Sequence, residues 1–195
     1  MFKELRYMNI IETDRLIIRE FNKKDYLDLY KYINHIDVNC FKCLEVNNIK
    51  EAKKELKKRI KLNKNKDDIY LAICLKDSNT LIGEVSAHLE TIDFTQKNKD
   101  TYSISYLFNK DHMHKGYAYE SIYAFLSYLF KKDFVHRVFA YVEDYNVLSI
   151  NLLKRLNFRK EGEFKEFISF TNDQNNNPIY ENTCVYAILK KEFFK

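Results

Sequence analysis

The chain has 195 residues, of which 46% are hydrophobic and 31% charged, with a formal net charge of +5. Fifteen Tyr and fifteen Phe exclude a disordered chain, and the length predicts one domain, residues 1–195, with its own core. Since no apolar run approaches the roughly 20 residues of a membrane helix and no signal peptide is visible, we expect a cytoplasmic protein without a membrane partner.

Hydrophobic periodicity predicts alternating strands and helices. In chain order we expect a strand at 16–21, helices at 23–33 and 49–62, strands at 69–76, 81–89 and 102–108, a helix at 116–131, a strand at 135–142, a helix at 147–156, and strands at 158–170 and 179–189. The Asn-rich segment 172–178 predicts the loop of a terminal hairpin. Adjacent strands at both ends, with a strand–helix–strand crossover between them, predict a mixed sheet covered by helices, in the α/β (α+β) class.

Positive charge concentrates on the second helix and just after it. Nine Lys and Arg residues lie between Lys50 and Lys66, against Glu51 and Glu55. An apolar stripe is expected to dock this helix and to leave the charges as a solvated face; it consists of Ala52, Leu56, Ile60 and Leu62. Nucleic-acid binding is the alternative, but no nucleic-acid motif accompanies the charges, so that partner is not expected.

The four cysteines do not predict a metal centre. Cys40 and Cys43 form a C-x-x-C, but no second pair or nearby His-x-x-His completes a zinc site. We therefore expect two thiols on a helix-rich segment, with redox or metal chemistry as the alternative. Cys74 and Cys184 lie in apolar strand-like runs and are expected to be buried.

A turn around Gly116 is a candidate anion site. Gly116 is one of only three glycines and lies between a predicted strand and a predicted helix. Unpaired N–H groups and the positive end of the helix dipole meet there, which suits a phosphate or pyrophosphate. An ordinary strand-to-helix turn is the alternative. The candidate residues are Met113, His114, Lys115, Gly116, Tyr117 and Ala118.

Four motifs resemble the GNAT acyltransferase superfamily, and within it the branch of ribosomal-protein N-terminal (alanine/serine) acetyltransferases. The first is TDRLIIR at 13–19, like T-E-R-L-x-L-R, and the second is ISYLF at 104–108, like I-G-Y-W-L. The third is KGYAYE at 115–120, within a pattern like G-K-G-Y-A-T-E. The fourth is HRV at 136–138, followed by NVLS at 146–149 and LNFRKEG at 156–162, like H-R-V, N-x-x-S and L-G-F-x-x-E-G. The resemblance covers about residues 10 to 190.

This resemblance implies a fold and a reaction. The fold would be a mostly antiparallel twisted sheet of about seven strands with helices on both faces. The strands at 102–108 and 135–142 would splay into a V, helped by a β-bulge near Ser105. The reaction would move an acetyl group from acetyl-CoA to a primary amine, such as a protein N-terminus or a small amine, without a metal. The alternative is a CoA-binding sensor or interaction module that has lost its chemistry. A homodimer is left open.

The resemblance also implies how the coenzyme would be held. The turn 113–118 would bind the pyrophosphate through its amides, although His114 stands where the family pattern has glycine. A backbone N–H near Leu107 or Phe108 would bind the oxyanion. Asn146 would cap the following helix, contact the pantetheine amide, or do both.

The proton-transfer groups are less determined. Leu153 occupies the position where many GNAT enzymes have a catalytic Tyr, so Ser149 is expected to protonate or position the leaving thiolate. Ser103 stands where the branch often has a Glu, so the base must come from elsewhere. Glu84 is the first candidate, on a central strand where a carboxylate must face a cleft. The alternatives are Glu166, Glu181, His88, His136 and a water chain.

Overall fold

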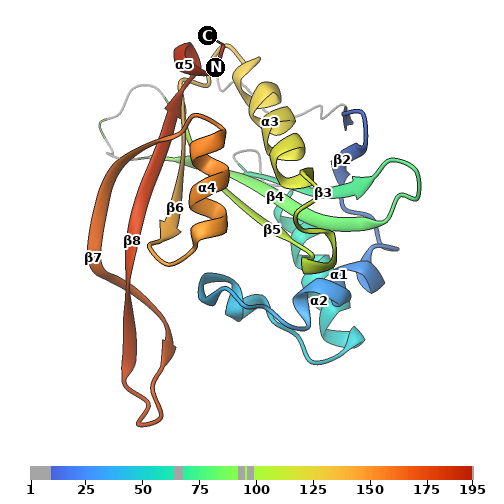
Figure 1. The fold of residues 1–195 in the computed structure, drawn as a ribbon. Helices are drawn as coiled ribbons and strands as arrows, with labels where there is room; N and C mark the ends of the chain where they lie inside the picture. Colours follow the sequence, from blue (N-terminus) through green and yellow to red (C-terminus); the bar gives the residue numbers. More distant parts are fainter. Residues whose placement is uncertain (1–9, 64–67, 92–94, 96–98, 195) are drawn as a thin grey trace.

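The computed structural model describes residues 10–63, 68–91, 95 and 99–194. In this part of the chain eight strands form one sheet, in the order β1-β2-β3-β4-β5-β6-β8-β7 (Figure 1). The strands are β1 (Ile11–Glu12), β2 (Leu16–Glu20), β3 (Asp68–Leu75), β4 (Leu81–Glu90), β5 (Thr101–Phe108), β6 (Arg137–Glu143), β7 (Arg159–Asn172) and β8 (Pro178–Leu189). The helices are α1 (Tyr26–Ile33), α2 (Ile49–Leu62), α3 (Tyr117–Phe130), α4 (Val147–Arg155) and α5 (Lys190–Phe193), with 3₁₀ turns η1 (Asn39–Leu44) and η2 (Lys110–His112).

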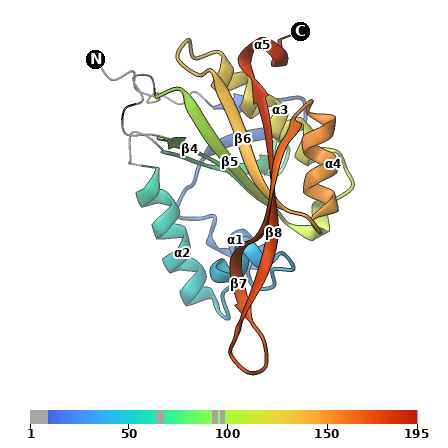
Figure 2. The same cartoon turned by 90° about the vertical axis from the view of Figure 1, so that its left-hand side faces the viewer.

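The sheet is antiparallel except at one seam. The strands β5 and β6 run parallel and pair only from Thr101–Arg137 to Ser103–Phe139, after which they diverge (Figure 1); Figure 2 shows the same sheet turned by 90°. This confirms the predicted splay. The expected bulge near Ser105 is wrong, because β4 and β5 keep one register from Gly83–Phe108 to Glu90–Thr101. A shift in register occurs instead between β3 and β4, at Ile73 and Cys74.

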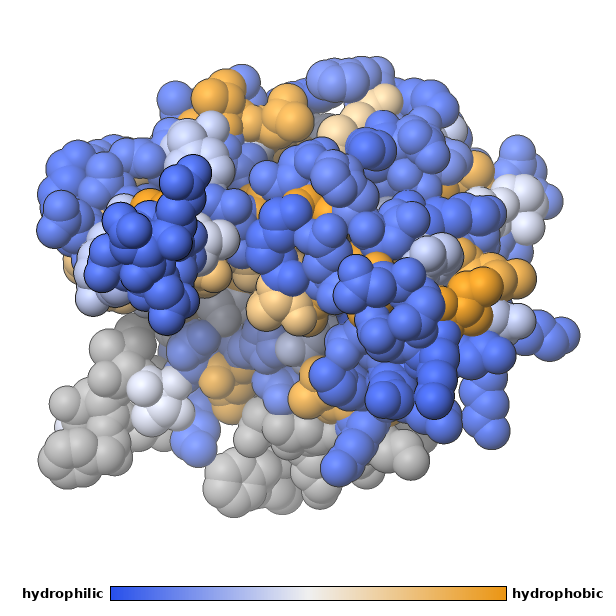
Figure 3. Space-filling view, turned by 90° about the horizontal axis from the view of Figure 1, so that it is seen from below, coloured by the Kyte–Doolittle hydropathy of each residue, from blue (hydrophilic) through white to orange (hydrophobic). Residues whose placement is uncertain are grey.

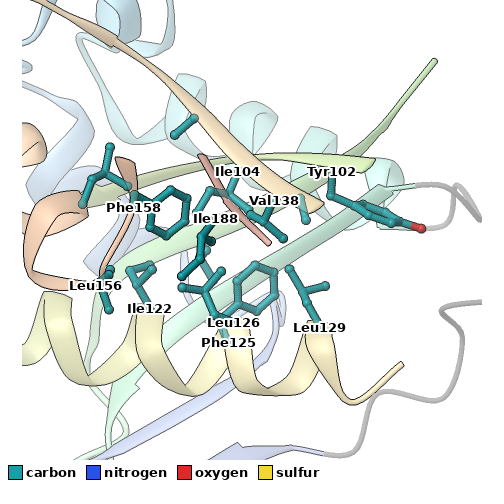
Figure 4. Packing of buried hydrophobic residues seen from close by; sticks show 14 of the residues in the cluster. Tyr102, Ile104, Ile122, Phe125, Leu126, Leu129, Val138, Leu156, Phe158 and Ile188 are labelled. Atoms are coloured by element: carbon teal, nitrogen blue, oxygen red, sulfur yellow. The ribbon is translucent and has the colours of Figure 1, made fainter. Parts of the chain in front are cut away.

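Two hydrophobic clusters lie on opposite faces of the sheet. On one face α3 and α4 pack against the central strands, and the inner side of α3 is fully buried, with Ile122, Phe125, Leu126 and Leu129 pointing at β5, β6 and β8 (Figure 4). On the other face α1 and α2 cover β3 and β4. Each buried Leu, Ile or Phe side chain contributes about 1.5–3 kcal/mol to the stability of the fold. The packing of these two layers therefore holds the ends of β5 and β6 in position.

The helix α2 docks mainly as predicted. Asn48 caps it by accepting a hydrogen bond from the Glu51 N–H, and Ala52 and Leu56 are buried. Leu62 is 42% exposed, so its predicted docking is wrong; the buried position at this end of the helix belongs to Arg59. The lysines between 50 and 61 are exposed, as expected for a solvated face, whereas Lys64 and Lys66 lie outside the described residues. Seen from this side, the surface is mainly hydrophilic with separate apolar patches (Figure 3).

The cysteines behave largely as predicted. Cys40 and Cys43 lie on the 3₁₀ turn η1 as free thiols, and Cys74 and Cys184 are buried. Among the residues that the structure describes, no cluster of His, Cys, Asp and Glu could hold a metal ion. None of the described helices is long and apolar enough to cross a membrane.

Candidate active site

A cavity of about 420 Å³ opens where β5 and β6 diverge. Its walls come from the ends of both strands, the turn before α3, the exposed side of the first turns of α4, and η1. The volume lies in the range of small-molecule sites. Nine of the site residues expected from the sequence line its wall, but Lys115 does not; the nine are Leu107, Phe108, Met113, His114, Gly116, Tyr117, Ala118, Asn146 and Ser149.

The turn before α3 presents unpaired backbone donors to this cavity. Gly116, the N-cap of α3, has a φ of 81°, in the left-handed region that glycine adopts without strain. His114 has a φ of 59°, so the position where the family pattern has glycine does require this conformation. Within the described part of the chain, the N–H groups of residues 114–119 have no acceptor, whereas the Met113 N–H donates to the Lys110 carbonyl. These free donors, at the positive end of the helix dipole, are chemically suited to an anion.

Arg15 of the loop before β2 fixes this turn from outside. Its guanidinium donates to the Lys115 carbonyl at 3.0 Å, pairs with Glu120 at 2.5 Å and lies over the Tyr117 ring at 4.6 Å. The Lys115 ammonium donates to the Asp111 carbonyl at 3.1 Å. The turn is therefore held in place without any ligand, which reduces the entropic cost of binding an anion there.

The exposed edge of β5 forms the floor of the cavity. Beyond Ser103 this edge has no partner strand among the described residues, so its backbone groups are open to a ligand. Leu107 and Phe108 pair on the other edge with Glu84 and Gly83. A Cβ on Gly83 would lie 2.7 Å from the Leu107 carbonyl oxygen and 2.7 Å from Phe108 Cδ1, so only glycine lets the end of β5 lie this close.

Two hydroxyl groups meet across the cavity. Ser149 Oγ on α4 and the Tyr106 hydroxyl on β5 are 2.7 Å apart, and either can donate. Asn146 caps α4 by accepting a hydrogen bond from the Ser149 N–H at 3.2 Å. Burial raises the pKa of Tyr106 to about 12, against a smaller opposing effect of the Ser149 hydrogen bond. The phenol therefore keeps its proton at neutral pH. Leu153 is fully buried in the core, as its apolar side chain requires.

Sequence reasoning missed Tyr106 as a functional residue. It lies within the ISYLF motif, but the contact with Ser149 spans 43 positions in the chain and arises only from tertiary packing. The signal available was the strand alternation of Ile104, Tyr106 and Phe108, which places a tyrosine on the face that α4 covers.

Glu84 is engaged elsewhere. Its two carboxylate oxygens accept from Arg59 Nε at 2.6 Å and Nη2 at 3.0 Å, and the Tyr32 hydroxyl donates to it at 3.0 Å. Burial alone would lower the pKa of Arg59, but Glu84 outweighs this and raises it. The carboxylate does not line the cavity. A carboxylate held by one guanidinium and a phenol, away from the cavity wall, is poorly placed to accept a proton from a substrate.

Three of the alternative bases are also placed away from the cavity wall. His88 lies between Tyr70 at 3.1 Å and Asp68 at 3.0 Å. His136 is exposed at the start of β6, and Glu166 is exposed on β7. None of these three side chains lines the cavity.

A buried carboxylate that the sequence analysis did not propose does line the cavity. Glu143, the last residue of β6, is 4% exposed, and the Cys40 thiol of η1 is its neighbour on the cavity wall. Burial raises the pKa of Glu143, and the nearby Glu181 raises it further. Glu181 on β8 is itself 8% exposed and accepts from Asn39 Nδ2 at 2.6 Å and from the Tyr145 hydroxyl at 2.9 Å. In the sequence, Glu143 stands beside Asp144 just after a predicted strand, where acidic residues commonly belong to a turn.

Comparison with known proteins agrees with this geometry. A family profile described as "Acetyltransferase (GNAT) domain" matches residues 15–159. The chain is 31% identical over 183 residues to an uncharacterized N-acetyltransferase, YnaD, of Bacillus subtilis (strain 168), covering 94% of this chain and 98% of the relative.

Solved structures agree as well. A GNAT-family acetyltransferase from Bacillus anthracis superposes with a TM-score of 0.78 at 27% identity, covering 94% of this chain and all of that chain (100%). RimL, a ribosomal L7/L12 α-N-protein acetyltransferase solved with coenzyme A, superposes with a TM-score of 0.71 at 18% identity, covering 93% and 98%. At that identity RimL shows the fold alone.

Proposed function

The chain belongs to the GNAT acetyltransferase family, and we propose that it transfers the acetyl group of acetyl-CoA to a primary amine by direct attack of the amine on the thioester. One observation supports this most: the free N–H donors of the turn before α3 and the Tyr106–Ser149 hydroxyl pair open into the same cavity. The first suits a pyrophosphate and the second suits a leaving thiolate.

The coenzyme would be held by backbone more than by side chains. The N–H groups of residues 114–118 would bind the pyrophosphate, with the positive end of the α3 dipole behind them. The pantetheine arm would follow the unpaired edge of β5, where backbone N–H and C=O groups are free to bond its amides. Asn146, whose side chain already caps α4, lies beside this path.

The chemical step would need one new bond and one proton for the sulfur. The amine nitrogen attacks the thioester carbonyl carbon, and a backbone N–H at Leu107 or Phe108 stabilises the oxyanion. The C–S bond then breaks, and the thiolate takes the proton of Ser149 Oγ, which Tyr106 replaces across 2.7 Å. A proton released by the amide nitrogen restores the hydroxyl pair, so the transfer balances.

A thiol-release assay with acetyl-CoA tests this proposal. The acceptor panel would contain peptides of varied N-terminus, because a protein N-terminus is the acceptor typical of the resembled branch, together with small amines and aminoglycosides. Ser149→Ala and Tyr106→Phe should each lower kcat by about 10²-fold with little change in CoA affinity. The matched control is Ser127→Ala, a partly exposed serine of α3 whose hydroxyl donates to the Tyr123 carbonyl of its own helix. Turnover of both variants at the wild-type rate would remove the hydroxyl pair from the mechanism.

A further inference from the structure

We propose that Glu143 and Glu181 form the subsite that receives the acceptor as an ammonium, with Glu143 as the group that removes its proton. The aromatic surface next to them then selects an amine attached to an apolar group. This inference rests on the proposed function and specifies the acceptor of the same site.

The two carboxylates are neighbours, and of the two Glu143 lines the cavity while Glu181 lies behind it. Glu143 pairs with Thr183 in the last step of the β6–β8 ladder, and Glu181 lies two residues before Thr183 on the same face of β8. Both carboxylates are more than nine-tenths buried. Glu143 lines the cavity directly, as does the neighbouring Cys40.

These carboxylates lack the cation that other buried acids of this chain have. Asp25 is paired with Arg19 at 2.9 Å, and Glu84 with Arg59 at 2.6 Å. In the part of the chain that the structure describes, neither Glu143 nor Glu181 forms an ion pair; the partners of Glu181 are an amide and a phenol, and the neighbour of Glu143 is a thiol. Burying two neighbouring carboxyl groups without a countercharge is costly. A ligand that brings one positive charge and several N–H donors would remove this cost.

An unsatisfied hydroxyl marks the same place. Thr183 is 2% exposed, and its Oγ1 is a buried side-chain oxygen without a hydrogen-bond partner. As the cross-strand partner of Glu143, it shares that residue's face of the sheet. Buried polar atoms are normally bonded, so an unsatisfied hydroxyl on the same face of the sheet as both carboxylates indicates a missing partner. An ammonium has three N–H donors to distribute among such acceptors.

Aromatic rings extend from the carboxylates toward solvent. Tyr141 lines the cavity two residues before Glu143, and its ring stacks with that of Phe167 at 6.1 Å. Phe164 continues the row, 4.9 Å from Phe167. These rings are 51%, 50% and 44% exposed for Tyr141, Phe167 and Phe164 respectively. A contiguous exposed aromatic surface beside a buried anionic site suits an apolar or aromatic group next to an ammonium.

The proton balance is complete with these groups. Glu143 as the carboxylate takes one proton from R–NH₃⁺, which leaves the neutral R–NH₂ that can attack. The N–C bond then forms and the C–S bond breaks as described above, and Glu143 finally releases its proton to solvent. No other reactant is needed.

The test compares Glu143→Gln with wild type on amines that differ only in the adjoining group. Phenethylamine, butylamine and spermidine serve as small acceptors, and a peptide beginning Ala-Phe represents a protein N-terminus. We expect E143Q to lower kcat/KM for every acceptor by about 100-fold, with unchanged calorimetric affinity for CoA. The control is Glu20→Gln, an exposed carboxylate on β2 away from the cavity. Phe167→Ala should lower kcat/KM for phenethylamine by about fivefold, with spermidine unaffected.

A pH profile separates proton removal from mere structure. The groups that face Glu143 are Cys40 from η1, Glu181 from β8 and, bonded to Glu181, Tyr145 from the following loop. Wild-type kcat/KM should fall as pH drops and Glu143 becomes protonated, and E143Q should lack this acidic limb. A purely structural role would leave the limb in place.

Calorimetric titration of phenethylamine into the CoA complex distinguishes the two levels of the proposal. If E143Q acetylates amines at the wild-type rate, the subsite is refuted while the transferase activity stands. If wild type binds the amine, E143Q does not, and neither transfers acetyl, the subsite stands and the proposed reaction fails. If wild type shows neither amine binding nor transfer across the panel, the subsite is refuted.

Discussion

The substitution His114→Gly should stabilise the protein, because His114 holds a φ of 59° in the turn that faces the cavity. The left-handed conformation costs an ordinary residue about 1–2 kcal/mol, whereas glycine adopts it freely. Glycine loses about 0.5–1 kcal/mol through the greater entropy of the unfolded chain. The net gain in unfolding free energy is therefore about 0.5–1 kcal/mol.

The assay is thermal unfolding followed by calorimetry with CoA. For a chain of this length 1 kcal/mol moves Tm by about 2–4 °C, so H114G should melt about 1–4 °C above wild type. Its CoA affinity should be no weaker, because the amides of the turn keep their conformation and lose a neighbouring side chain. Asn157→Gly is the matched control: Asn157 has a φ of 64° but does not line the cavity.

N157G should gain less stability, because Asn tolerates this conformation better than His, and it should leave CoA binding unchanged. A lower Tm for H114G than for wild type would refute the strain argument. A weaker CoA affinity in H114G would show instead that the imidazole itself contacts the ligand.

Three further predictions concern buried groups. Glu84→Gln should cost about 3 kcal/mol, because it leaves the buried Arg59 charge with only the longer contact to Glu55 at 3.3 Å. The double variant with Arg59→Met should recover most of this in urea unfolding, and a single variant as stable as wild type would contradict the pairing. Glu143→Gln should raise stability at neutral pH. Because the pKa of Glu143 is raised in the folded state, the unfolded state loses this proton first as pH rises above 4.5, and the wild type loses stability over that range. The glutamine variant has no such proton to lose. Melting curves from pH 4 to 8 should therefore diverge from wild type toward high pH, and parallel curves would refute the shift. Gly83→Ala should cost about 1–3 kcal/mol through its contact with the Leu107 carbonyl oxygen, and unchanged unfolding would show that the end of β5 can move.

The fold could be predicted from sequence because its elements are long and regular. The periodicity of α3 identified its buried face, and the apolar runs of β3 to β5 located three neighbouring strands. The strand β1 and the 3₁₀ turn η1 were missed, because two or six residues carry too little pattern to be read. The burial of Arg59 within a lysine-rich helix follows from Glu84, which is 25 positions away and invisible to periodicity.

The candidate site was predicted only where it is local. The turn 113–118 forms from consecutive residues, so glycine and helix-start chemistry sufficed to find it. The Tyr106–Ser149 pair and the Glu143–Glu181 cluster join distant segments through strand splay and through η1. No motif spacing in the sequence indicates that these residues lie close together. A carboxylate was chosen at Glu84 because its strand is central, but the structure turns that side chain toward α2 and Tyr32.

The seam between β5 and β6 divides the sheet into two parts. Among the described residues, only three residue pairs join β5 to β6. A coenzyme bound in the gap would contact both parts of the sheet, and mass action would add its binding free energy to the stability of the whole chain. Under the proposed function, acetyl-CoA would therefore also stabilise the fold of the enzyme. Resistance of the protein to proteolysis should then rise with the concentration of acetyl-CoA.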